Sequence, residues 1–174
     1  MTDYSAKILD ALDAFQEGIY IVNDDFTVEY MNRYMRDLFG EGTGKKCHRV
    51  LIGSDKPCSW CRCSEIFNKN ENHHSEVYIR SIDRHFSLTE LPVHNQDGTR
   101  SKLSIYRDIT KSKEREAMYL SSKESYQRLF NHVGCGVFIS SKKGRFLNVN
   151  PALLEILGYE DKDEFLSLDL ATDV

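Results

Sequence analysis

The sequence lacks any long hydrophobic run. Its longest apolar stretches, at 19–22 and 152–157, are only a few residues long, whereas a helix that spans a bilayer needs about 20 apolar residues. The first residues include Asp3, Asp10 and Asp13, which excludes a secretory signal with a basic head and an apolar centre. These absences predict a cytoplasmic chain without a membrane segment.

The sequence also lacks an excess of positive charge. Its 23 Lys and Arg residues are outnumbered by 27 Asp and Glu residues, and the formal net charge is −4. Nucleic acid is therefore not an expected partner, because phosphate binding requires concentrated positive charge. The sequence has no G-x-S-x-G, no glycine-rich phosphate loop and no H-E-x-x-H, and so predicts no enzymatic activity in this chain.

An internal repeat is the main positive feature. The segments GIYIVNDDFTVEYMNRYMRDLFG (18–40) and GVFISSKKGRFLNVNPALLEILG (136–158) align without gaps at an offset of 118. Each predicts two short strands joined by a polar turn, followed by a helix that ends at a glycine. Asn32 and Asn150 stand at the N-cap position of these helices, where a side-chain oxygen accepts from the first exposed amides.

Only the first copy continues into further strands. A helical and loop region at about 43–70 is followed by strand-like stretches at 74–82, 84–95 and 99–109. Alternating apolar residues predict that these strands bury one sheet face, in the pairs Val77/Ile79, Phe86/Leu88 and Leu103/Ile105. Five strands with helices inserted between the second and third predict an α+β domain.

The predicted elements divide the chain into three parts. Residues 1–110 form a complete domain with an N-terminal helix, residues 111–125 a connecting helix, and residues 126–174 the first part of a second domain. The second copy is expected to lack three of the five strands. Its length therefore suggests a fragment of a longer protein.

The two ends of the first domain resemble those of PAS sensor domains. The strand, turn, strand and helix-starting Asn resemble the family's opening, and Arg107-Asp108-Ile109-Thr110 resembles its D-I-T ending. The resemblance covers about 8–110 and 126–174. It implies the PAS fold, with a five-stranded antiparallel sheet, and a sensory module in a bacterial two-component system, upstream of a histidine kinase. It also implies a homodimer, an unidentified small-molecule ligand and a C-terminal output domain in the same polypeptide.

The D-I-T ending has a physical role of its own. Asp108 lies where the last strand becomes a helix, and Thr110 can cap that helix. A carboxylate there also interacts favourably with the positive end of the helix. The resemblance implies that Asp108 and Thr110 transmit ligand or redox state into the connecting helix. The alternative is that both residues are ordinary caps.

Four of the five cysteines lie close together, at Cys47, Cys58, Cys61 and Cys63. In a cytosolic protein such crowding favours metal or redox chemistry over structural disulfides. Four thiolates would suit tetrahedral zinc or an iron–sulfur cluster, and the domain would then be a metal-based redox sensor. Reduced structural thiols and a reversible thiol switch are the alternatives.

Aromatic residues predict the core, and six of them could line a ligand pocket between sheet and helices: Tyr30, Tyr34, Phe39, Trp60, Phe67 and Phe86. Gly44-Lys45-Lys46-Cys47 resembles the flavin-binding helix of light-oxygen-voltage domains, but Lys46 replaces the flavin-contacting Asn. Flavin is therefore not expected. Haem is not expected either, because His73 and His74 fall past the predicted helix end. A further alternative is a ligand-free dimerisation module upstream of a diguanylate cyclase.

Overall fold

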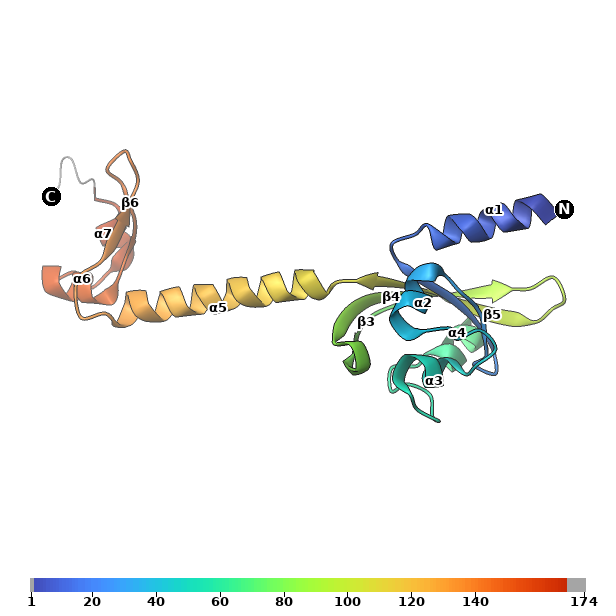
Figure 1. The fold of residues 1–174 in the computed structure, drawn as a ribbon. Coiled ribbons are helices and arrows are strands. Elements are labelled where there is room, and N and C mark those ends of the chain that lie inside the picture. The colour runs from blue at the N-terminus through green and yellow to red at the C-terminus, as the bar shows by residue number, and fades with distance from the viewer. Residues whose placement is uncertain (1, 169–174) are drawn as a thin grey trace. The chain divides into compact units, whose positions relative to one another are not determined.

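The structure, a computed structural model, describes residues 2–168 and divides into two compact units. The first unit is Met1–Lys113 and the second is Glu114–Val174. The boundary falls within helix α5 (Thr110–His132), whose first turn belongs to the first unit (Figure 1).

The first unit is built on one antiparallel sheet. Its strands lie side by side in the order β2-β1-β5-β4-β3 (Figure 1). Every neighbouring pair is antiparallel, which confirms the predicted five-stranded sheet. The strands are β1 (Gly18–Asn23), β2 (Val28–Met31), β3 (His73–Ile79), β4 (Arg84–His94) and β5 (Arg100–Asp108).

Short helices connect β2 to β3, as predicted. An N-terminal helix, α1, precedes the sheet, and a 3₁₀ turn, η1, leads from β3 to β4. None of the described helices has the length and hydropathy needed to cross a membrane. The helices are α1 (Thr2–Asp13), α2 (Arg33–Phe39), α3 (Cys47–Ile52), α4 (Cys63–Lys69) and η1 (Arg80–Ile82).

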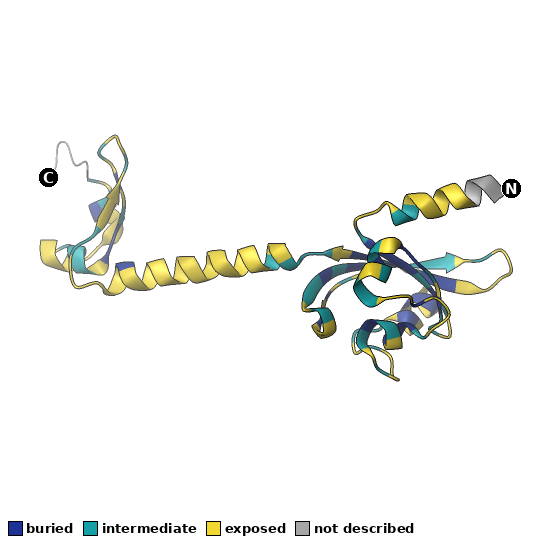
Figure 2. Cartoon of the chain, in the orientation of Figure 1, coloured by how far each residue is buried: buried dark blue, intermediate teal, exposed yellow. Residues whose placement is uncertain are grey.

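The core of the first unit lies between helices α2, α3 and α4 and one face of the sheet (Figure 2). Strands β1, β4 and β5 contribute side chains that are at most 3% exposed, and the helices contribute most of the opposite layer. The contributing residues include Tyr20, Val22, Phe86, Leu88 and Tyr106 from the strands and Met35, Leu51 and Phe67 from the helices.

The prediction of which face of β5 is buried is wrong. Leu88 pairs directly with Tyr106, so Tyr106 points to the same side as Leu88. Period-two alternation then places Lys102 on this side as well, and it is 3% exposed. Leu103 and Ile105 lie on the opposite face and are half-buried. Apolar alternation therefore misidentified the buried face, because β5 carries a polar side chain into the core.

The second unit contains a two-stranded antiparallel sheet of β6 (Phe138–Ser140) and β7 (Phe146–Val149). Helices α6 (Pro151–Leu157) and α7 (Lys162–Leu166) follow. Its small core comprises Phe146, Val149 and Phe165. Several large apolar side chains of this unit remain exposed, among them Leu147, Ile156 and Leu157.

The repeated asparagines make matching hydrogen bonds in the two units. Asn32 Oδ1 accepts from Ile19 N at 2.9 Å and from Met35 N at 3.2 Å, and its Nδ2 donates to Glu17 O at 2.9 Å. The equivalent bonds of Asn150 are from Val137 N at 2.8 Å, from Leu153 N at 3.0 Å and to Cys135 O at 2.9 Å. Each asparagine therefore caps its helix, as predicted, and also ties the helix to the preceding strand.

Candidate functional site

Three of the four clustered cysteines line one small cavity of the first unit. It lies between the sheet and the segment that carries α3 and the loop leading to α4, and it has about 10 Å³ of free space. This is at most enough for one water molecule. The lining residues are Tyr20, Cys47, Leu51, Pro57, Cys58, Trp60, Cys61, Glu90, Lys102 and Tyr106.

A buried ion pair forms one wall of this cavity. The Lys102 ammonium donates to Glu90 Oε1, and each side chain is 3% exposed. Glu90 Oε2 and the hydroxyl of Ser104, which pairs opposite Glu90 in the sheet, have no hydrogen-bond partner. Sequence reasoning missed this pair. The signal that could have found it is Glu90, which continues the inward alternation of Phe86 and Leu88 along β4.

The charge of Lys102 also acts on two of the cysteines. The Lys102 ammonium lies close enough to the Cys63 and Cys61 thiols for its charge to act on both, and these two thiols also act on each other. The neighbouring Cys63 thiol lowers the pKa of Cys61 to about 6, and the nearby Lys102 charge acts in the same direction. Cys61 can therefore carry a thiolate at neutral pH, in a position where a lysine offsets its charge.

The other three thiols of the cluster are held in the protonated form. The neighbouring Cys61 thiol, together with burial, raises the pKa of Cys63. Burial raises the pKa of Cys58 to about 12 and also raises that of Cys47. The four cysteines are therefore chemically distinct, with one candidate nucleophile among them.

The predicted C-x-x-C pair lies on a tight turn. Cys61 N donates to Cys58 O at 2.9 Å, which closes a turn with Ser59 and Trp60 at its corner. Both turn cysteines are half-buried, whereas Cys47 and Cys63 are buried. The two half-buried sulfurs are therefore the ones that a small reagent reaches first.

This arrangement does not fit a metal ion. Among the described residues, no three His, Cys, Asp or Glu side chains are gathered so that they could hold one. The charge of the Lys102 ammonium acts on both Cys63 and Cys61, and this positive charge would repel a metal cation bound by these thiols. Binding of zinc or an iron–sulfur cluster by Cys47, Cys58, Cys61 and Cys63 stays a prediction that would require the loop to rearrange.

Only Trp60 of the six predicted pocket aromatics lines this cavity. Phe67 and Phe86 pack in the core, where Phe86 contacts Tyr106 edge to face at 5.6 Å between ring centroids. Tyr30 lies elsewhere and donates to Asp13 at 3.2 Å. Tyr20 and Tyr106, which the prediction did not include, bring their hydroxyls within 3.5 Å of each other. Burial raises the pKa of both tyrosines, which keeps them neutral.

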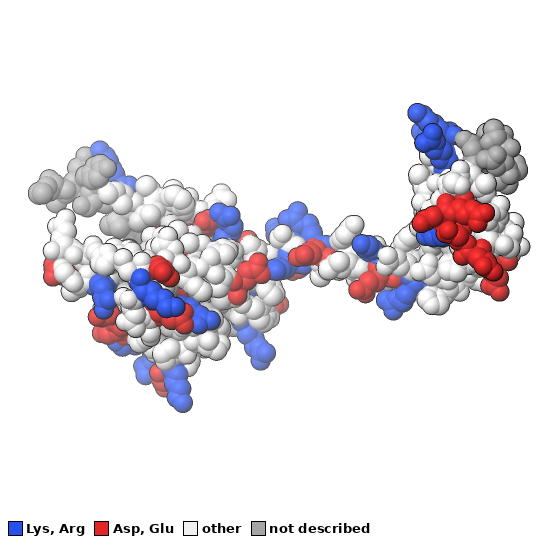
Figure 3. Space-filling view, turned by 180° about the vertical axis from the view of Figure 1, so that it is seen from behind, with Lys and Arg blue, Asp and Glu red and all other residues white. Residues whose placement is uncertain are grey.

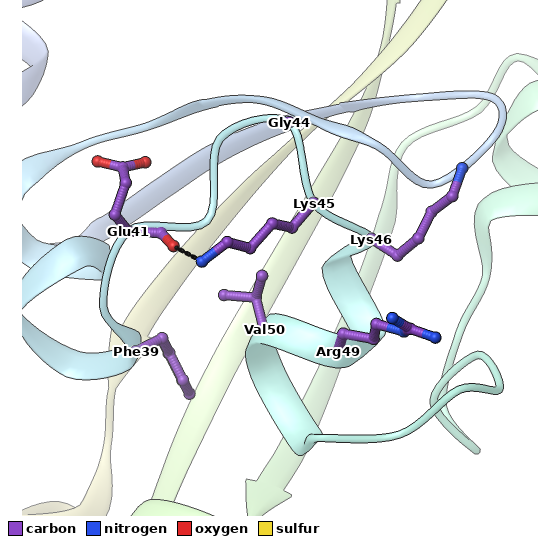
Figure 4. Close-up of a pocket in the computed structure, with 7 residues that line it drawn as sticks. All are labelled: Phe39, Glu41, Gly44, Lys45, Lys46, Arg49 and Val50. Carbon is purple, nitrogen blue, oxygen red and sulfur yellow. Dashed lines mark hydrogen bonds between the residues drawn. The ribbon is translucent and has the colours of Figure 1, made fainter.

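Phe39 lies instead on a separate surface groove of about 440 Å³ (Figure 4). The basic residues on this groove already have partners. Lys45 Nζ donates to the backbone oxygen of Glu41 at 2.8 Å, and Arg49 pairs with Asp55 at 2.6 Å. Basic and acidic side chains are also interspersed on the face of the first unit seen in Figure 3. The groove is therefore a weaker candidate for a site than the cysteine cavity.

The junction between β5 and α5 is held by Asp108. One carboxylate oxygen accepts from Thr110 N at 2.9 Å, and the other pairs with Arg84 Nη1 at 2.6 Å. The Thr110 hydroxyl accepts from His85 N at 3.0 Å. The expected cap is therefore supplied by Asp108, while Thr110 ties the start of α5 to the start of β4.

Two more contacts surround this junction. The Tyr34 hydroxyl lies close enough to Arg84 and Asp108 for their charges to act on it, so this predicted pocket residue of α2 lies beside the junction instead. Lys113 of α5 pairs with Glu76 of β3 at 2.7 Å. The first turn of α5 is therefore attached to β3 and β4 as well as to the end of β5.

The stability that Asp108 provides should depend on pH. Burial acts to raise the pKa of Asp108, but hydrogen bonds from Thr110 and the Arg84 charge lower it more, so the net pKa is lowered. Its contribution is then complete above the unfolded pKa of about 3.9 and is lost as pH falls through the lower folded value. We expect Asp108→Asn to lower the free energy of unfolding by about 1 kcal/mol at neutral pH. This difference should vanish at a pH low enough to protonate the Asp108 carboxyl group in both the folded and the unfolded protein.

Urea unfolding of the two proteins at a series of pH values checks this expectation. The exposed Asp37, which pairs with Arg33 on α2, supplies the control Asp37→Asn. The assignment would be contradicted if the difference in free energy of unfolding between wild type and Asp108→Asn stayed constant down to a pH about two units below 3.9.

Comparisons with known proteins agree with this architecture. A PAS domain profile matches residues 16–111 and a second PAS domain profile matches residues 124–174. The search of curated proteins found no match. A solved RNA-binding light-oxygen-voltage receptor is 16% identical, with 70% of this chain and 38% of that chain covered and a TM-score of 0.54.

Two single-domain structures align over more of their own length. The PAS domain of nitrogen regulation protein NR(II) from Vibrio parahaemolyticus is 14% identical, covers 59% of this chain and 97% of its own, and has a TM-score of 0.49. The PAS domain of BvgS from Bordetella pertussis is 18% identical, with 71% of this chain and 98% of that chain covered and a TM-score of 0.47. Because the profile over 16–111 spans more than half of the 174 residues, this chain belongs to the PAS domain family of sensory modules.

Proposed function

We propose that the first unit is a sensor whose cysteine cavity controls the start of helix α5. The observation that carries this proposal is that β5 contributes to both places. Lys102 lies in the cavity, and Asp108, six residues further on the same strand, caps α5. Residues six apart on a strand face the same side of the sheet.

The neighbouring strand makes the same connection. Glu90 of β4 lies in the cavity, and β4 begins at Arg84 and His85, which bind Asp108 and Thr110. A change in charge or shape at the Lys102–Glu90 pair would shift β4 and β5 against each other. That shift would alter the bonds that hold the first turn of α5, provided that the junction has two arrangements of similar free energy.

Hydrogen exchange in the first turn of α5 tests this coupling. The amides of Thr110, Ser112 and Lys113 have defined acceptors at Asp108 and Ile109. We expect Glu90→Gln, which removes a charge but keeps the shape, to change exchange at these amides by about five-fold or more. In an Asp108→Asn background the same change should have little effect, because the two groups would no longer be coupled.

The matched control removes a charge from an exposed pair. Asp55, which is 81% exposed and pairs with Arg49, supplies Asp55→Asn, and it should leave the α5 amides unchanged. Cys63→Ala is a gentler change beside Lys102, just outside the cavity lining, and it should act in the same direction as Glu90→Gln. Equal effects of Glu90→Gln with and without Asp108 would show that the change does not pass through Asp108, and the proposal would fail.

The remaining expectations for the signalling protein stay predictions. They are a histidine kinase or diguanylate cyclase output domain, a cytoplasmic location, and dimerisation. Exposed apolar residues of α1 and α5 support dimerisation, namely Ile8 and Leu9 on α1 and Met118, Tyr119 and Leu129 on α5.

A further inference from the structure

The C-x-x-C turn brings two thiols of unequal character together. Cys58 and Cys61 are the first and last residues of a hydrogen-bonded turn, so their Cα atoms lie within about 7 Å. A disulfide needs a Cα separation of about 4.4–6.8 Å. The turn can therefore accept a disulfide with little movement of its backbone.

The surroundings of Cys61 distinguish it from the other cysteines. It lines the same cavity as Lys102, and both the neighbouring Cys63 thiol and the Lys102 charge favour its thiolate form. It is also half-buried, so its sulfur can be reached by a small oxidant. Cys47 and Cys63 are buried at the starts of α3 and α4, and neither lies on the turn.

The geometry points to a peroxide-sensitive disulfide switch in which Cys61 is the residue that reacts first and Cys58 is its disulfide partner. Cys63 acts as a positioning residue that favours the thiolate form of Cys61. This inference rests on the proposed function only for its consequence in α5, because formation of the disulfide requires nothing outside the cavity.

The chemistry balances with a hydroperoxide as the oxidant. The Cys61 thiolate attacks one oxygen of hydrogen peroxide, so that an S–O bond forms, the O–O bond breaks and the released hydroxide takes up a proton to become water. Cys61 is then a sulfenic acid. The Cys58 sulfur attacks the Cys61 sulfur, its proton leaves with the Cys61 oxygen, and a second water is released. Two thiols and one peroxide have become one disulfide and two waters.

Oxidation would change the charge around Lys102. The disulfide carries no negative charge, so the Cys61 thiolate beside Cys63 and Lys102 would be lost. The Lys102 ammonium would then have Glu90 as its main counter-charge. This is the change that β4 and β5 would carry to Asp108 under the proposed function.

Trypsin distinguishes the possible disulfides in the intact chain. It cuts after Arg62 but not at Lys56, which precedes a proline, so Cys58 and Cys61 stay on one peptide, 50–62, while Cys63 falls on another, 63–69. After peroxide treatment and alkylation of free thiols, we expect an unalkylated peptide 50–62 that is lighter by two hydrogen atoms. Peptides 47–49, 63–69 and 129–142 carry the other cysteines and should be alkylated.

Variants test the individual roles. Cys61→Ser should abolish oxidation, whereas Cys58→Ser should leave a sulfenic acid at Cys61 that dimedone traps. Cys63→Ser keeps a hydrogen-bond donor and should preserve the rate of disulfide formation, but Cys63→Ala should slow it. The exposed Cys135 of the second unit supplies the control Cys135→Ser, which should change nothing.

Each outcome decides between the possibilities. A peptide 50–62 that stays fully alkylated in excess peroxide, or one that is covalently joined to 63–69, would overturn the assignment of the pair. If the disulfide forms as expected but the α5 amides do not respond, the switch stands and the proposed coupling to α5 fails. If Glu90→Gln acts on α5 but no disulfide forms, the coupling stands and this inference fails.

Discussion

Replacing Lys102 by Met should lower the free energy of unfolding of the first unit by about 3–5 kcal/mol. The variant keeps most of the side-chain volume but leaves the Glu90 carboxylate buried without its counter-charge, and a buried charge without a partner is strongly destabilising. Glu90 Oε2 already lacks a hydrogen-bond partner, so no second donor is in place to compensate. Urea unfolding followed by fluorescence of Trp60, the only tryptophan, measures the loss.

Two further variants separate the buried charge from other effects. The double variant Lys102→Met with Glu90→Met should regain most of the stability, because an apolar pair can replace a buried ion pair at little cost. Arg49→Met breaks an ion pair whose side chains are 64% and 81% exposed, and should cost at most about 1 kcal/mol. If Lys102→Met costs no more than Arg49→Met, the ammonium is not buried in solution.

The second large effect is expected at Asn32. Asn32→Ala should lower the free energy of unfolding by about 3 kcal/mol, since it removes a helix cap and leaves buried backbone groups unpaired. The Asn32 side chain is fully buried and binds two amides, together with the backbone oxygens of Leu12 and Glu17. The same urea titration measures the change.

An exposed asparagine of the same unit provides the matched control. Asn68 lies on the exposed side of α4, and Asn68→Ala should leave stability unchanged or slightly improved, because Ala favours helix. Asn32→Asp keeps the accepting oxygen but loses the donors to Leu12 and Glu17, so it should also be strongly destabilised. A loss at Asn32→Ala as small as that at Asn68→Ala would mean that the four bonds contribute little.

Local patterns were sufficient for most of the fold. Two strands and an Asn-capped helix were predicted in each copy because turns, caps and C-terminal glycines are effects of neighbouring residues. Strands β3, β4 and β5 and the long helix α5 were predicted for the same reason. The buried face of β5 was not predicted correctly, because Leu103 and Ile105 give the same alternation whichever side of the sheet they occupy. The register with β4 decides the side.

The candidate site, too, could be predicted from the sequence only in part. The crowding of Cys47, Cys58, Cys61 and Cys63 is visible along the chain, and so is the position of Asp108 at the end of a strand. Their chemical differences are not, because the character of Cys61 comes from Cys63 and from Lys102, which lies 41 positions further along the chain.

The sequence alone determined the family, the order of the elements and the cysteine cluster, since these depend on residue identity and on interactions between near neighbours. Only the tertiary structure decided that Lys102 and Glu90 are buried together beside the cysteines and that their strands lead to Asp108. Charged side chains are normally assigned to the surface, and their burial as a pair depends on β4 and β5 being in register beneath α3 and α4. The cavity is therefore a product of strand pairing between residues that no local pattern connects.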